Sequence, residues 1–125
     1  PTKGAIPVEC TSIDEFLQAS SAQSADVIKI DVEVAELFVL KGMKETIKRS
    51  DSLILFVEFN PGCLQLAGVE PGTLLQELES LGFEIQLIDE NSRRLIQIKE
   101  DRLREKYSNP SWYANLYCVK RRRSC

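Results

Sequence analysis

The sequence predicts an α/β fold with a mostly parallel sheet, and two strands with the segment between them carry this prediction. Residues 26–32 are a β-branched run and residues 52–59 are almost continuously apolar, so both are predicted strands. Between them, residues 37–47 repeat apolar side chains at helical spacing. A strand that is apolar on both sides is typical of a parallel sheet with helices on both faces.

Two short elements are expected before these strands. Residues 6–10 form an apolar piece whose proline suits an edge strand or a lead-in. Thr11 or Ser12 is a suitable N-cap for a short helix through Leu17. Within the helix predicted between the two strands, Gly42 is expected to cause a bend or a split.

The alternation of strands and helices continues to the end of the chain. Residues 60–62 (Asn-Pro-Gly) have turn composition, Pro71 suits a helix start, and Gly82 suits the position after a helix end. The later predictions are a strand at 83–88, a hairpin arm at 95–98, a charged helix at 99–107 and a strand at 114–119. This order predicts right-handed crossovers in one domain, residues 1–119, followed by a basic tail, residues 120–125.

The charge distribution argues against nucleic-acid binding. The net charge is −3, yet residues 120–123 supply four positive charges, so the rest of the chain is more acidic than the total suggests. An acidic body repels phosphate backbones, and a basic end is most simply a solvated terminus. The longest apolar run, residues 53–57, is too short to cross a bilayer, so no membrane partner is expected.

The cysteines argue against a zinc site. There are four of them, no two are spaced as a CxxC motif, and the chain has no histidine. Cys10 and Cys118 lie in apolar runs and are predicted core residues, whereas Cys63 is predicted in a loop. This usage is typical of reduced thiols in a cytoplasmic protein.

Acidic side chains follow the two central strands where those strands end. Asp31, Glu33 and Glu36 come after the first strand, and Glu58 and Asn60 end the second. Ligands of open α/β sheets bind beyond the carboxyl ends of the strands, so these groups are expected to share one rim if the strands are neighbours. Such a cluster could accept a substrate proton, hold a cationic ligand or hold a divalent ion.

Each of these acids could instead have a structural role. Glu36 could stabilise the following helix through its dipole, and Glu33 could cap that helix. Asp31 and Glu58 end strongly apolar strands, where a charge costs desolvation, so a functional role is favoured for them. The chain has no Gly-x-Gly-x-x-Gly motif and no phosphate-binding loop, and without histidine it has no Ser-His-Asp arrangement.

Residues 28–43, Ile-Lys-Ile-Asp-Val-Glu-Val-Ala-Glu-Leu-Phe-Val-Leu-Lys-Gly-Met, closely resemble the I-K-I-D-V-E-G-A-E-x-x-V-L-x-G signature of the FkbM-family methyltransferases. Residues 8–17, the strand end at 56–58, the strand at 82–85 and the terminal run 115–119 are similar to the corresponding parts of the family. The resemblance therefore extends over nearly the whole chain.

This resemblance implies the C-terminal half of a Rossmann-like class I methyltransferase fold, the fourth to seventh strands, with an antiparallel last strand. The parent enzyme would use S-adenosylmethionine to O-methylate a small molecule or sugar. The cofactor glycine loop and the ribose-binding acid would lie upstream, so the chain alone is expected to bind no cofactor and to be inactive. Asp31 and Glu58 would be catalytic, and Glu33, Glu36 and Asn60 would contact substrate. Whether a metal takes part is left open.

The sequence departs from the family signature at Val34, where the signature has glycine. A β-branched side chain disfavours positive φ and close backbone approach, so altered substrate choice or lost activity is expected. Without upstream strands, the edge of the strand at 26–32 would be exposed and would favour a homodimer. The alternative to a methyltransferase part is a non-catalytic interaction or dimerisation module, and the open reading frame before Pro1 would discriminate between the two.

Overall fold

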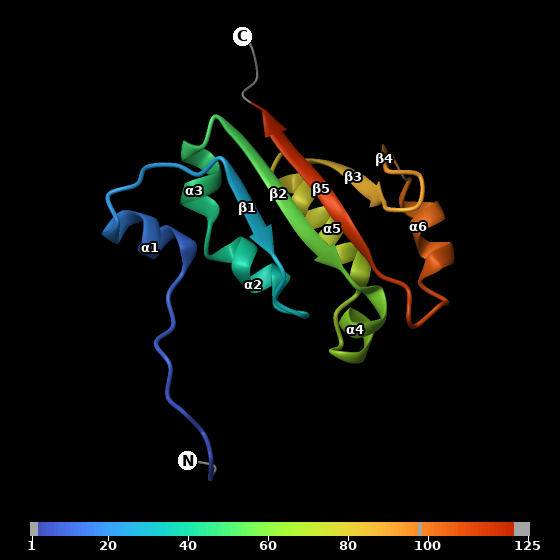
Figure 1. Cartoon of the computed structure of the whole chain (residues 1–125), viewed down its shortest axis with the longest axis horizontal. Helices are drawn as coiled ribbons and strands as arrows, with labels where there is room; N and C mark the ends of the chain where they lie inside the picture. Colours follow the sequence, from blue (N-terminus) through green and yellow to red (C-terminus); the bar gives the residue numbers. More distant parts are fainter. Residues whose placement is uncertain (1–2, 98, 122–125) are drawn as a thin grey trace.

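One open sheet forms the centre of the computed structural model, which describes residues 3–97 and 99–121 (Figure 1). Its five strands are hydrogen-bonded in the order β1-β2-β5-β3-β4. They are β1 (Val27–Ile30), β2 (Ser52–Phe59), β3 (Glu84–Asp89), β4 (Arg94–Ile96) and β5 (Ala114–Arg121). The mixed α/β class predicted from the sequence is confirmed.

The prediction of a mostly parallel sheet is wrong. Only β1 and β2 pair in parallel, whereas β2–β5, β3–β5 and β3–β4 are antiparallel. The physical reason is where the last strand inserts. The antiparallel β5 lies between β2 and β3, so one reversed strand creates two antiparallel ladders, and the β3–β4 hairpin adds the third.

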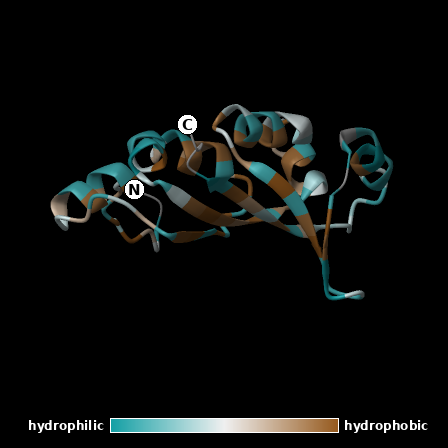
Figure 2. Cartoon of the chain, turned by 90° about the horizontal axis from the view of Figure 1, so that it is seen from above, coloured by the Kyte–Doolittle hydropathy of each residue, from teal (hydrophilic) through white to brown (hydrophobic). Residues whose placement is uncertain are grey.

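Six helices accompany the sheet in the described residues, and in the view of Figure 2 they lie on one side of it. They are α1 (Ile13–Ala19), α2 (Glu36–Lys41), α3 (Lys44–Arg49), α4 (Pro61–Leu66), α5 (Pro71–Ser80) and α6 (Glu100–Lys106). The expectation of helices on both faces is therefore not met within the described chain.

The strand burial follows from this one-sided cover. In β2, the four side chains at 53, 55, 57 and 59 are buried, while Ile54, Phe56 and Glu58 are half-buried on the other face. In β5, Tyr117 takes the same half-buried position and its ring lies beside that of Phe56, with centroids 5.7 Å apart and the ring planes tilted by 53°. The core thus fills the space between the sheet and α2 to α6, and the opposite sheet face carries apolar groups that the described helices do not cover.

The structure confirms some of the local predictions and contradicts others. Residues 6–10 form no strand, and Cys10 is exposed and not in the core, because the piece makes no ladder with the sheet. The split of the helix at Gly42 is confirmed, since α2 ends at Lys41 and α3 begins at Lys44. Cys118 is buried as predicted.

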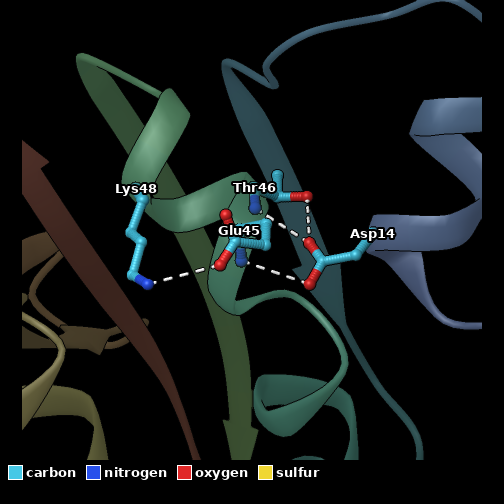
Figure 3. Close-up of polar contacts among 4 residues, drawn as sticks. All are labelled: Asp14, Glu45, Thr46 and Lys48. Carbon is cyan, nitrogen blue, oxygen red and sulfur yellow. Dashed lines mark hydrogen bonds and ion pairs between the residues drawn. The ribbon is translucent and has the colours of Figure 1, made fainter.

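Helix α1 is attached to α3 through one carboxylate, shown in Figure 3. Asp14 accepts hydrogen bonds from the Thr46 N–H (2.8 Å), the Thr46 hydroxyl (2.7 Å) and the Glu45 N–H (3.1 Å). The α3 N-cap residue, Met43, supplies no side-chain cap of its own. Asp14 therefore caps a helix that is remote in sequence, and Ser12 and Glu15 form a capping box at the start of α1.

The C-terminal end of the described chain differs from the prediction. Lys120 and Arg121, predicted to begin the basic tail, belong to β5, and the Lys120 ammonium donates to the Ile47 carbonyl. The rest of that tail, residues 122–125, lies outside the described residues. Across the part of the chain that the structure describes, no helix has the length and apolar character needed to cross a membrane.

Candidate functional site

Asp31 and Glu58 meet at the end of the parallel strand pair. The β1–β2 register ends with Ile30 opposite Val57, so Asp31 and Glu58 stand one step beyond the last paired residues. Their carboxyl groups share a hydrogen bond. The Lys29 ammonium lies 3.5 Å from the Asp31 Oδ2 and is itself largely exposed. The expectation that these two strands are neighbours and bring both acids to one rim is confirmed.

The two carboxyl groups are shifted in opposite directions. The hydrogen bond with Asp31 raises the pKa of Glu58, and burial and the negative charges of Asp31, Glu33 and Glu36 raise it further. The hydrogen bond with Glu58 lowers the pKa of Asp31, burial acts to raise it, and the positive charge of Lys29 lowers it further. Asp31 therefore gives up its proton at a lower pH than Glu58 does.

A small hollow opens beside this pair. Its volume is about 130 Å³, and it is lined by Glu33, Val34, Glu36, Glu58, Asn60, Cys63 and Leu64. Four of the five predicted site residues thus line one hollow, and the fifth, Asp31, joins it through its hydrogen bond to Glu58. The sequence order of these residues, from the ends of two strands and the starts of two helices, explains why they converge.

Glu36 differs from the other acids of the hollow because it is buried. It is only 4% exposed, and among the described residues its Oε2 has no hydrogen-bond partner. A carboxylate oxygen that is removed from water and left without a donor costs free energy. The predicted role of Glu36 as a helix-start charge fits its place at the first residue of α2, but it does not explain the unsatisfied oxygen.

The loop between Asp31 and α2 is strained. Glu33 has φ +44° and Val34 has φ +66°, both in the left-handed region that favours glycine. The expectation that valine would avoid positive φ at this position is wrong. Val34 packs partly against the core, and Glu33 remains exposed at the hollow, so the surrounding structure holds the loop in this conformation.

Helix α4, which lines one side of the hollow, was not predicted from the sequence. Residues 60–62 were predicted as a turn, but Asn60 is the N-cap of α4 and its Oδ1 accepts from the Cys63 N–H at 3.1 Å. Asparagine followed by proline is a helix-start signal, and it could have revealed this element. As a result, Cys63 and Leu64 reach the hollow from a helix and not from a loop.

The backbone behind α4 leaves no room for a side chain. A Cβ added at Gly62 would lie 2.6 Å from the Pro110 carbonyl oxygen, in the segment that leads into β5. Gly62 therefore sets how closely α4 approaches this segment. The hollow depends on this contact because Cys63 and Leu64 follow directly on the same helix.

The described residues contain no group of three or more acidic or cysteine side chains arranged to hold a metal ion. A larger hollow of about 530 Å³ lies between the β3–β4 hairpin and the segment before β5, and it includes none of the predicted site residues.

The comparisons with known proteins agree with the signature at the hollow. The family model described as the Methyltransferase FkbM domain matches residues 1–85, which include both acid-bearing strand ends. The similarity predicted for residues 115–119 lies outside this match. No curated protein and no solved structure matches the chain. Because the match covers more than half of its length, the chain belongs to the FkbM methyltransferase domain family.

Proposed function

We propose that this chain is the C-terminal, substrate-side half of an S-adenosylmethionine-dependent methyltransferase that O-methylates a small molecule or a sugar. Family membership supports methyltransferase chemistry. The single observation that carries the proposal is the Asp31–Glu58 pair, two carboxyl groups joined by a hydrogen bond at the rim of a hollow. Perturbed acid pairs of this kind are typical of reaction sites.

In this proposal Asp31 is the general base. Methylation of a hydroxyl oxygen forms a C–O bond, breaks the methyl–sulfur bond and releases the hydroxyl proton, which needs an acceptor. Asp31 is suited to that role because it is exposed, and its hydrogen bond with Glu58 keeps it charged. Glu58 orients Asp31 through the hydrogen bond that joins their carboxyl groups.

The cofactor would supply the methyl group as an electrophile when bound. A sulfonium is a cation, and the exposed carboxyl groups of Asp31 and Glu33 fit a positive charge nearby. The chain has no Gly-x-Gly-x-x-Gly motif after a strand, so we propose that an upstream segment of the parent grips the cofactor and that this chain alone binds none. Glu33, Glu36 and Asn60 are the proposed substrate contacts, and the proposed location is cytoplasmic.

The test requires the protein that joins this chain to its cofactor-binding segment. Methyl transfer from labelled S-adenosylmethionine to hydroxylated small molecules is measured for Asp31→Asn, Glu58→Gln and the control Glu84→Gln, which is exposed on β3. We expect Asp31→Asn to lower kcat by roughly 10²-fold or more, since a positioned base contributes that much, with cofactor affinity unchanged. A wild-type rate in Asp31→Asn would refute the assignment.

A second function is supported by the edge of the sheet. β1 is an edge strand, and Val27 on it is 57% exposed. The alternative proposal is a homodimerisation module that pairs through this edge without catalysis. Light scattering of the chain should then show a dimer that Val27→Lys converts to a monomer. A wild-type chain that stays monomeric at high concentration would exclude this alternative.

A further inference from the structure

The hollow beside Glu58 contains a buried oxygen without a hydrogen-bond donor, and the Asp31–Glu58 pair does not explain it. Within the described chain, the Glu36 Oε2 is buried without a hydrogen-bond donor, and Glu36 lines the hollow. Buried polar atoms in folded proteins nearly always have a partner, so an exception calls for an explanation. A ligand that brings a donor into the hollow would supply the missing partner.

The neighbours of Glu36 narrow the chemistry of that donor. Glu33 and Glu36 both act on Glu58 as negative charges, so the hollow has a negative potential. The Asn60 Oδ1 already accepts one hydrogen bond, from the Cys63 N–H, and a carbonyl oxygen has a second lone pair to offer. The lining thus presents acceptors and negative charge together, which suits a donor that is also a cation.

The volume of the hollow and the need for a hydrogen-bond donor together favour one class of cation. Its volume of about 130 Å³ corresponds to roughly four water molecules at about 30 Å³ each. A primary ammonium at the end of a chain fits this space and offers three N–H donors. A sulfonium has three carbon substituents and no donor, so it would leave the Glu36 oxygen unsatisfied.

We propose that this hollow binds the primary ammonium group of a small molecule, with Glu36 as the main hydrogen-bond acceptor and Glu33 and Asn60 beside it. Binding of the ammonium does not depend on methyl transfer. The identification of its carrier as the methyl acceptor rests on the function proposed above, and it assigns the acceptor to the class of amino alcohols and amino sugars.

The experiment uses the chain as it is and small probes in place of the unknown ligand. Methylammonium, trimethylsulfonium, magnesium chloride and methanol are each titrated while backbone amide NMR signals are followed. We expect methylammonium to shift the signals of the hollow with a Kd of roughly millimolar to tens of millimolar, as suits a probe of two heavy atoms. Equal or tighter binding of trimethylsulfonium or magnesium at the same signals would overturn the ammonium assignment.

Two variants locate the binding. Glu36→Gln should weaken methylammonium binding about 10-fold, which corresponds to the loss of one charge-assisted hydrogen bond. Glu33→Gln removes a charge from the exposed rim of the same hollow and should weaken binding less. The control Glu79→Gln, exposed on α5, should bind as the wild type does. Unchanged affinity in Glu36→Gln would refute the proposal.

A measurement on the wild-type chain keeps the test decisive should Glu36→Gln not fold. Cys63 lines the hollow and is exposed, whereas Cys10 is exposed but does not line it. Methylammonium should slow the alkylation of Cys63 by iodoacetamide relative to Cys10, and methanol should not. Equal alkylation rates at Cys63 with and without methylammonium would count against the site.

The outcomes separate the two proposals. Methylammonium binding in the chain, with no methyl transfer by the parent protein, would retain the ammonium site and reject the methyltransferase role. Methyl transfer that depends on Asp31, without methylammonium binding in the hollow, would do the reverse.

Discussion

Two carboxylates in this protein occupy opposite situations. At the α1–α3 junction, Asp14 receives three hydrogen bonds and faces the start of a helix (Figure 3). At the rim of the sheet, Glu58 faces Asp31, Glu33 and Glu36, all of the same charge. Burial acts to raise the pKa of Asp14, but the hydrogen bonds from Thr46 and Glu45 outweigh it and hold that pKa below its ordinary value, while the pKa of Glu58 is raised.

The hydrogen-bond donors and like charges around an acid distinguish a structural acid from a candidate functional one. Asp14 stabilises the fold because each of its neighbours is a donor. Glu58 and Glu36 lie where the fold offers too few donors and too many like charges, beside a loop with two residues of positive φ. A protein tolerates unsatisfied groups, like charges and backbone strain when the surrounding packing holds them in place. Such unfavourable features are common at ligand-binding sites.

The largest expected effect tests the support behind the rim. Gly62→Ala should destabilise the protein by about 3 kcal/mol, at the upper end for an overpacked site, since the new Cβ would lie 2.6 Å from the Pro110 carbonyl oxygen. Urea unfolding measures the change in the free energy of unfolding. The control Gln65→Ala, exposed on the same helix, should change it little. Equal stability of the two variants would mean that α4 moves freely.

The second prediction tests the role of Asp14, which accepts three hydrogen bonds. Asp14→Ala should cost about 2 kcal/mol, because it uncaps α3 and leaves the buried Thr46 hydroxyl without its acceptor. The lowered pKa of Asp14 also makes a contribution that is present above its ordinary value of 3.8 and is lost as pH falls through the lowered value. Asp14→Ala should lack that acid-side loss in thermal melts, whereas the exposed control Asp101→Asn should keep it.

A smaller effect tests the strained loop. At Val34, with φ +66°, Val34→Gly releases backbone strain but also loses side-chain packing, whereas Val34→Ala loses the packing alone. We expect the glycine variant to be more stable than the alanine variant by about 1 kcal/mol. In the longer parent that we propose, calorimetry should show that Val34→Gly changes substrate or cofactor affinity. Identical stabilities of the two variants would mean that the loop is not strained.

The fourth prediction tests the Asp31–Glu58 pair at the rim of the sheet. The raised pKa of Glu58 means that its contribution to stability is complete below the ordinary value of 4.5 and is lost as pH rises through the raised value. Glu58→Gln keeps a neutral side chain at all pH values, so it should raise stability at neutral pH by less than about 1 kcal/mol. Thermal melts across this range should show the gain only above the raised pKa. A gain of the same size at acidic pH would point to packing and not to charge.

Much of the local structure could be predicted because its causes are local. The β-branched and apolar runs of β1 and β2, the split at Gly42 and the proline at the start of α5 depend on neighbouring residues, and the structure has each of them. The juxtaposition of Asp31 and Glu58 could also be predicted, because consecutive parallel strands end at the same edge. The start of α4 was local too, but its asparagine and proline also fit a turn.

The element order, the α/β class and the acidic strand ends follow from side-chain periodicity and from short-range backbone preferences. Other features arise only when the chain packs: where β5 inserts, which face the helices cover and that Asp14 caps a helix some 30 residues away. Another is that the Glu36 Oε2 is buried without a donor. These features depend on which distant segments pack together, and that is set by the burial of the whole apolar surface and not by any single stretch of chain.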